Sequence, residues 1–313
     1  MKRVQKHLAD HRVVTYCIVT FILTWGYWLI AVYPRALPLM EAGKSVFSDS
    51  LTVMLIGAGM LFPAIGVVVT RLLTGEGFRG VWIKPVRFRR TWKYYVAGWL
   101  GPIALVAVGG AVYFLLNSNQ FDPSMPMFVE TMQEQLGSAG TPAAMDESEI
   151  RMLGYAQLAL VLVAPFLNCV TCFGEEWGWR GYLLQHMLEK RNVTFSIVVS
   201  GVIWGLWHAP ITVLGHNYGL DYPGWPFLGI VAMCCFCVVL SCLFSWLTLR
   251  AKSCLPAVLA HGAVNSCISA PSMFLIGTPN PFIGPTATGI IGGIGFIVVA
   301  VLCLTSLRKR PEC

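Results

Sequence analysis

Charged residues are scarce in this chain. Only 12% of its 313 residues are Asp, Glu, Lys or Arg, whereas soluble domains carry about 25%. Apolar residues make up 56% of the chain, and the mean hydropathy is +0.66. A composition this poor in charge excludes an ordinary soluble globular protein and predicts an integral membrane protein.

The chain also lacks a second cysteine pair to match Cys169-x-x-Cys172. All of its 11 cysteines except Cys313 lie in or beside apolar runs, where a cysteine acts as a small apolar residue. This placement argues against a disulfide framework, and the unmatched pair does not indicate a redox or zinc site. The segment Arg310–Cys313 lacks the form of a prenylation signal, in which three residues follow the cysteine.

Eight apolar runs contain no Asp, Glu, Lys or Arg. Each run has about the 20 residues that a helix needs to span the hydrocarbon core of a membrane. We therefore predict an all-α polytopic membrane protein, with about eight transmembrane helices enclosing a polar intramembrane cavity. Residues 1–313 are expected to form a single integral membrane domain. The predicted helices cover residues 13–33, 51–70, 95–116, 152–173, 194–214, 227–249, 255–275 and 286–307.

Basic residues gather on one side of the predicted membrane. With a cytoplasmic N-terminus, all of the 22 Lys and Arg residues except Arg35, Lys44 and Arg151 fall on the cytoplasmic side, which is the positive-inside pattern. Both termini are then cytoplasmic in a multi-pass protein of the cell membrane. Because this pattern accounts for the net charge of +7, the predicted partner is the lipid bilayer and not nucleic acid.

Two long loops separate the predicted helices. The loop 117–149 is acidic, and we expect it to be external and partly helical near residues 128–136. The loop 71–93 is basic and contains Trp82, Phe88 and Trp92. That mixture is typical of an interfacial segment in contact with anionic lipid head groups.

Three charged side chains directly follow one apolar run. Charge inside a membrane is costly and usually functional, so Glu175, Glu176 and Arg180 are candidate site residues. Glu176 and Arg180 are four residues apart, share a helix face and can form an ion pair. Glu175 lies about 100° around the helix and stays available as a general base. The alternative is an ordinary charged helix end at the membrane surface.

Two later runs carry the two histidines of the predicted membrane helices. Trp204 and His208 are four residues apart, as are His261 and Asn265, so each pair shares a helix face. Polar side chains one turn apart in an apolar helix are typical of a polar cavity. The alternatives are a packed, hydrogen-bonded His208 and interhelical hydrogen bonds from His261 and Asn265.

Taken together, these side chains predict a site for hydrolysis, above all of a peptide bond. Glu175 would take a proton from water, His208 would shuttle it, and His261 with Asn265 would stabilise an oxyanion. Glu175, His208 and His261 with a water molecule can equally bind zinc. The spacing leaves the zinc and the metal-free mechanisms open.

The three segments resemble the CPBP family of intramembrane proteases, which includes type II CAAX prenyl endopeptidases and bacteriocin-processing and immunity proteins. The family motifs are Glu-Glu-x-x-x-Arg, Phe-x-x-x-His and His-x-x-x-Asn. They appear here in family order, with Trp204 in place of phenylalanine, as Glu175-Glu176-x-x-x-Arg180, Trp204-x-x-x-His208 and His261-x-x-x-Asn265. The core of the resemblance spans about residues 150–275.

The resemblance implies an intramembrane endopeptidase that acts on a membrane-associated or lipidated, CAAX-like protein or on a small peptide. It implies catalytic roles for Glu175, His208, His261 and Asn265, supported by Glu176 and Arg180. Two other functions stay open. One is a non-catalytic bacteriocin self-immunity or binding protein. The other is a proton-coupled transporter with Glu175, His208 and His261 as its relay.

Overall fold

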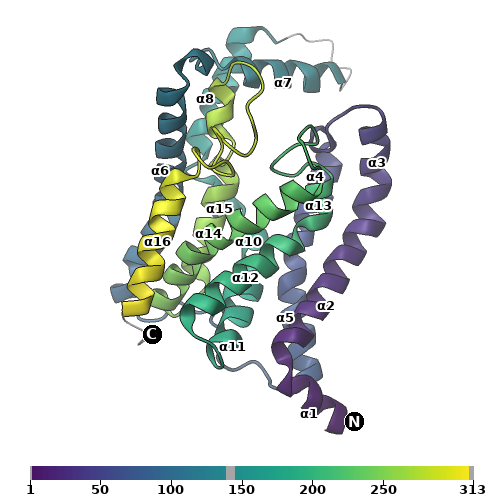
Figure 1. Ribbon diagram of the computed structural model, residues 1–313, viewed down its shortest axis with the longest axis vertical. Coiled ribbons are helices and arrows are strands. Elements are labelled where there is room, and N and C mark those ends of the chain that lie inside the picture. The colour runs from purple at the N-terminus through teal and green to yellow at the C-terminus, as the bar shows by residue number, and fades with distance from the viewer. Residues whose placement is uncertain (1, 139–144, 310–313) are drawn as a thin grey trace.

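The computed structural model describes residues 2–138 and 145–309. Every regular element in these residues is a helix (Figure 1), and the predicted all-α polytopic fold is confirmed. Four helical segments are long and apolar enough to cross a membrane. They are Arg12–Glu41, Ser50–Thr74, Phe88–Leu116 and Phe227–Ala251.

The helices follow one another with connections of very different length, the longest between Cys267 and Ile294. The first part of the chain forms α1 (Lys2–Asp10), α2 (Arg12–Tyr27), α3 (Tyr33–Glu41), α4 (Ser50–Ala58), α5 (Phe62–Thr74), α6 (Phe88–Leu116), α7 (Pro126–Ser138) and α8 (Glu147–Leu160). The rest forms α9 (Ala164–Leu167), α10 (Cys169–Glu176), the π-helix η5 (Trp177–Leu183), α11 (Leu184–Leu188), α12 (Val193–Trp207), α13 (Ala209–Val213), α14 (Phe227–Ala251), α15 (Leu255–Cys267) and α16 (Ile294–Lys309).

Four of the eight predicted runs are not single continuous helices. The run 152–173 is divided among α8, α9 and α10, and the run 194–214 between α12 and α13. Pro165 and Pro210 stand at the starts of α9 and α13, and a proline cannot donate the backbone hydrogen bond of a helix interior. In the run 255–275 the α-helix already ends at Cys267, and in the run 286–307 the helix begins only at Ile294.

Two helix starts carry polar caps. Asn192 precedes α12, and its side chain accepts a hydrogen bond from the amide of Phe195 at 2.9 Å. Asp146 precedes α8 and forms a capping box with Glu149. Hydrogen bonds from the Ser148 hydroxyl and the Glu149 amide hold the pKa of Asp146 below its usual value. Such caps satisfy backbone amides that have no partner inside the helix, so they fix where α8 and α12 begin.

The central helices pack most closely around α14 and α15. In Figure 1, α10, α12, α14 and α15 lie between α2, α3 and α5 on one side and α6 and α16 on the other. Glycines at Gly201 and Gly205 let α12 approach α14. A Cβ added at these two positions would lie 2.6 Å from the Cα of Val238 and 2.4 Å from that of Cys234. Small residues four apart allow this close packing in membranes.

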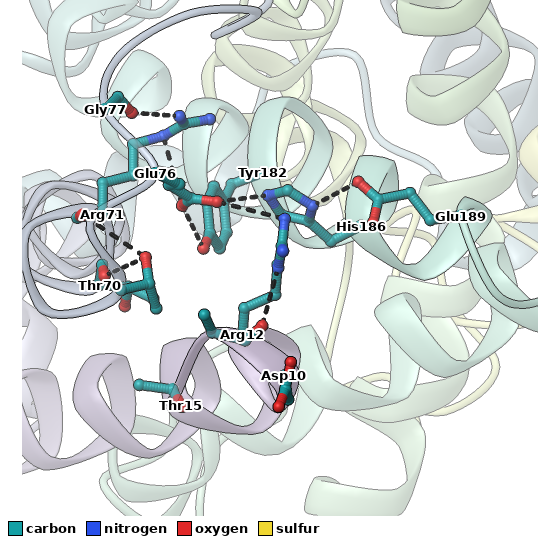
Figure 2. Close-up of polar contacts among 12 residues, drawn as sticks. Asp10, Arg12, Thr15, Thr70, Arg71, Glu76, Gly77, Tyr182, His186 and Glu189 are labelled. Carbon is teal, nitrogen blue, oxygen red and sulfur yellow. Dashed lines mark hydrogen bonds and ion pairs between the residues drawn. The ribbon is translucent and has the colours of Figure 1, made fainter. Parts of the chain in front are cut away.

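A partly buried carboxylate links the N-terminal helices to the central segment η5. Glu76 follows α5, and Figure 2 shows it among Arg12, Arg71, Tyr182 and His186. The Tyr182 hydroxyl donates to Glu76 at 2.7 Å. The nitrogens of Arg12, His186 and Arg71 lie 3.5, 3.6 and 3.9 Å from its oxygens. With only 14% of its side chain exposed, Glu76 holds α2, α5, η5 and α11 in register.

We expect Glu76→Gln to lower the free energy of unfolding by about 2 kcal/mol, because hydrogen bonds to charged groups contribute about 1.5–3 kcal/mol. The matched control is Glu189→Gln. Glu189 is 50% exposed and contacts His186 alone among the ion pairs of the described residues, so its loss should change stability by at most about 0.5 kcal/mol. Unfolding of both variants would be followed in one detergent. Equal effects would contradict the linking role of Glu76.

Candidate active site

A cavity of about 190 Å³ lies among the central helices. Its lining includes all four residues predicted to be catalytic, namely Glu175, His208, His261 and Asn265. They come from α10, from the junction of α12 and α13, and from α15. The structure therefore brings together polar side chains that lie up to 90 positions apart in the chain, Glu175 and Asn265 being the extremes.

Glu175 is held against two indole rings. The indole N–H of Trp204 donates to its Oε2 at 2.5 Å, and that of Trp179 donates to the same oxygen at 3.3 Å. No described residue makes a hydrogen bond to Oε1, and Glu175 lines the cavity. The side chain is 1% exposed. One carboxylate oxygen is thus anchored by the protein, and the other is left for a ligand.

The segment that carries Glu175 changes its helical winding at this point. The α-helix α10 ends at Glu176, and the π-helix η5 follows directly. Turns of π-helix are rare in proteins, and those that do occur are often found at functional sites. Gly178 lies in this segment against α2 and α5, where an added Cβ would be 2.6 Å from the Cβ of Pro63. Glycine at position 178 therefore permits a close approach of η5 to α2 and α5, and this contact helps to position the neighbouring Glu175.

The predicted ion pair between Glu176 and Arg180 is present at 3.1 Å, with neither side chain exposed. Arg180 also donates to the hydroxyl of Ser241 at 3.0 Å, and its guanidinium lies 4.1 Å from the ring centre of Trp204. Glu176 has a second partner, the Nδ1 of His261, at 2.9 Å. Glu176 and Arg180 do not line the cavity. Glu176 orients the ring of His261, and Arg180 in turn holds Glu176.

The bond to Glu176 determines which ring nitrogen of His261 faces the cavity. A carboxylate oxygen accepts hydrogen bonds, so Nδ1 of His261 carries a proton and Nε2 is the free ring nitrogen. His208 has the same arrangement, because its Nδ1 lies 2.9 Å from the backbone carbonyl of Trp204, which can only accept. In the neutral His208 ring, Nε2 is therefore a proton acceptor. The two histidines offer the cavity one ring nitrogen each.

His208 stands at the break between α12 and α13. A break leaves backbone carbonyls without helical partners, and the first helices supply donors. The indole of Trp25 donates to the carbonyl of Trp207 at 2.9 Å, and the hydroxyl of Tyr33 donates to that of Pro210 at 2.9 Å. The N-terminal helices α2 and α3 therefore help to position His208.

Asn265 and His216 complete the polar lining. The amide nitrogen of Asn265 has only a long contact with Cys172 Sγ, at 3.9 Å, so this side chain can still donate to a ligand. His216 is a third histidine of the cavity and was missed in the sequence because it lies between the predicted helices. Its ring is parallel to that of His208, within 3°, with the ring centres 6.0 Å apart.

The structure does not assemble a three-ligand metal centre from the residues that it describes. Among them, no group of three or more His, Cys, Asp or Glu side chains lies close enough together to hold a metal ion. The Nδ1 hydrogen bonds of His208 and His261 resemble those of metal-bound histidines, but Oε2 of Glu175 is occupied by two indoles. Zinc stays a proposal.

These observations define a class of protein: an all-α membrane bundle whose central cavity is lined by Glu, His and Asn side chains. Residues 157–267 match the family model described as "Type II CAAX prenyl endopeptidase Rce1-like", so the predicted resemblance of this region to that family is confirmed. The match includes every residue of the three motifs.

A curated relative agrees with this assignment. The chain is similar to the protein named "CAAX prenyl protease 2" of Methanococcus maripaludis, at 26% identity over 112 residues. The aligned part is 32% of this chain and 37% of the relative. The chain therefore spans little more than a third of the length of the curated relative that it matches.

We expect Arg180→Met to cost about 3–5 kcal/mol of stability, because it leaves the carboxylate of Glu176 buried without its counter-charge. The double variant Glu176→Gln/Arg180→Met should recover part of this loss, since no unpaired charge remains. The exposed Arg79→Met serves as the control. Thermal unfolding of the purified variants measures each effect. A double variant less stable than Arg180→Met would contradict the strain assigned to an unpaired Glu176.

Proposed function

We propose that this protein is an intramembrane endopeptidase that uses an activated water molecule to hydrolyse a peptide bond. The substrate is a membrane-associated or lipidated, CAAX-like protein or a small peptide. The observation that supports this most is the convergence of Glu175, His208, His261 and Asn265 on one cavity. The proposal includes a multi-pass position in the cell membrane with both termini in the cytoplasm. The basic residues near the chain ends support this orientation.

The attacking water lies between Glu175 and His208 in the proposed mechanism. Oε1 of Glu175 accepts its proton, and Nε2 of His208 is a second acceptor in hydrogen-bonding reach of the same cavity. The two indole N–H groups hold the carboxylate in one orientation. The oxygen of the water then bonds to the carbonyl carbon of the substrate.

The negative charge that develops on the carbonyl oxygen needs donors at the opposite side of the substrate. Asn265 offers an amide N–H. His261 lies at the same side, with its ring oriented by the hydrogen bond between Nδ1 and Glu176. The C–N bond then breaks, and the proton taken by Glu175 passes to the leaving amine. The products are a carboxylate and an amine, so the reaction consumes one water and needs no other reactant.

The decisive experiment is cleavage of plain and prenylated peptides by the purified protein in detergent. We expect Glu175→Gln and His208→Asn each to lower the turnover by at least about 10²-fold, which is the usual contribution of a general base. The exposed Glu189→Gln is the control and should leave turnover unchanged. Cleavage that survives Glu175→Gln would remove the proposed base. Parallel reactions with a chelator, followed by added zinc, test the metal.

The same variants separate the rival functions. A bacteriocin-immunity protein that only binds would still protect cells as Glu175→Ala, and a transporter would carry substrate into proteoliposomes. Loss of peptide cleavage, with neither protection nor transport, would support the peptidase.

Trp204→Phe gives a finer test because it keeps an aromatic ring and removes the N–H that donates to Glu175. A hydrogen bond to a charged group contributes about 1.5–3 kcal/mol, so we expect kcat to fall about tenfold or more with little change in KM. Trp207→Phe is a matched control, because Trp207 lines the same cavity and its indole N–H has no partner among the described residues. Equal losses in the two variants would show a packing effect.

A further inference from the structure

A large pocket lies away from the active site. It has a volume of about 1050 Å³ and is found where α12 begins and where α14 and α16 end. It shares no lining residue with the cavity that contains Glu175. Its volume is at the upper limit of the roughly 300–1,000 Å³ typical of ligand pockets. It can therefore accept an organic molecule of considerable size.

One wall of this cavity is apolar. Leu249 from α14 and Leu307 from α16 line it and are 5% and 1% exposed. Both belong to a small hydrophobic core of the molecule, separate from the main one. Val198 and Val199 of α12 extend the same wall. An apolar wall of this kind favours hydrocarbon over water.

The opposite part of the lining carries positive charge. Arg191 precedes α12 and Arg308 is near the end of α16, and both side chains are exposed. None of the ion pairs of the described residues includes either arginine. The guanidinium of Arg191 lies over the ring of Phe195, 5.4 Å from its centre. Two cations from separate elements therefore line one cavity, and no carboxylate of the described residues forms an ion pair with either.

An aromatic side chain from the basic loop 71–93 completes the lining. Trp82 has a left-handed backbone conformation, with φ at 57°, and its carbonyl accepts a hydrogen bond from the amide of Cys254 at 2.8 Å. The turn between α14 and α15 thus holds Trp82 in place. Tryptophan is enriched where a membrane protein meets the head groups of the bilayer.

We propose that this cavity is a specific binding site for one anionic phospholipid. Arg191 and Arg308 would hold the phosphate by charge-assisted hydrogen bonds. The acyl chain would lie along Val198, Leu249 and Leu307, and Trp82 would cover the boundary between the two regions. A free phosphate would leave the apolar wall uncovered, and a lipid without net charge would leave the arginines uncompensated. The inference does not rest on the proposed peptidase activity.

Binding to the full-length, delipidated protein in detergent tests the site. Phosphatidylglycerol and phosphatidylcholine would be titrated separately and detected by native mass spectrometry. We expect one phosphatidylglycerol per chain, and at least about tenfold weaker binding to Arg191→Gln/Arg308→Gln, since each surface cation contributes appreciably to the attraction of anionic lipid. The matched control is Lys190→Gln/Lys309→Gln, which removes two adjacent cations that do not line the cavity.

The control decides between a defined site and general attraction. Equal weakening by both double variants, or equal binding of both lipids, would overturn the proposal. A second variant, Val198→Trp, fills the apolar wall without changing charge and should also weaken phosphatidylglycerol binding. The water-soluble head group, glycerophosphoglycerol, should compete poorly; if it binds as tightly as the lipid, the apolar wall has no role and the proposal fails. Melting temperatures verify that each variant is folded.

Discussion

The buried ion pair between Glu176 and Arg180 is the constraint around which the central helices are arranged. Two charges with no exposed surface are tolerated only when each has a partner and further hydrogen bonds. The chain supplies them from several helices, with Ser241 of α14 and His261 of α15 as hydrogen-bonding partners. The ring of Trp204 from α12 covers the guanidinium. Satisfying this one pair therefore brings together the helices that form the cavity.

The site also requires close contact between helices. Hydrogen bonds of about 3 Å from one helix to another form only where no large side chain separates the two backbones. Gly178 meets this requirement beside α5, and Gly205 meets it between α12 and α14. The two indoles that donate to Glu175 come from separate segments, Trp179 from η5 and Trp204 from α12. Small residues at the contacts and large aromatic residues around the cavity thus have complementary roles in the same site.

Much of the site could be predicted from the sequence because its polar residues interrupt runs that are otherwise apolar. The i,i+4 spacing of Glu176 and Arg180 was sufficient to predict their ion pair. The hydrogen bonds to Glu175 were not predictable, since tryptophan counts as an apolar residue in a hydropathy pattern although its indole N–H is a donor. His216 was missed for another reason. It reaches the cavity from a connection wound through left-handed residues, Gly215 and Asn217, which no periodicity reveals.

The helix boundaries were predicted less well, and prolines explain part of the difference. Pro165 and Pro210 are apolar, so they do not interrupt a hydrophobic run, yet each marks the start of a new short helix. The break at His208 would weaken an isolated helix. Here Trp25 and Tyr33 donate to the carbonyls beside it, so a long-range contact stabilises a local irregularity. Sequence spacing contains no information about such donors.

The small size of the cavity has a consequence for how any substrate reaches it. A volume of about 190 Å³ is below the roughly 300–1,000 Å³ typical of ligand pockets. A peptide segment of a few residues is larger than this, and a lipidated one larger still. The proposed peptide substrate would therefore fit only if the side chains around His208 and Glu175 move apart. Substrate selection by the proposed peptidase would then depend on how far the surrounding helices can separate, as well as on the groups that line the cavity.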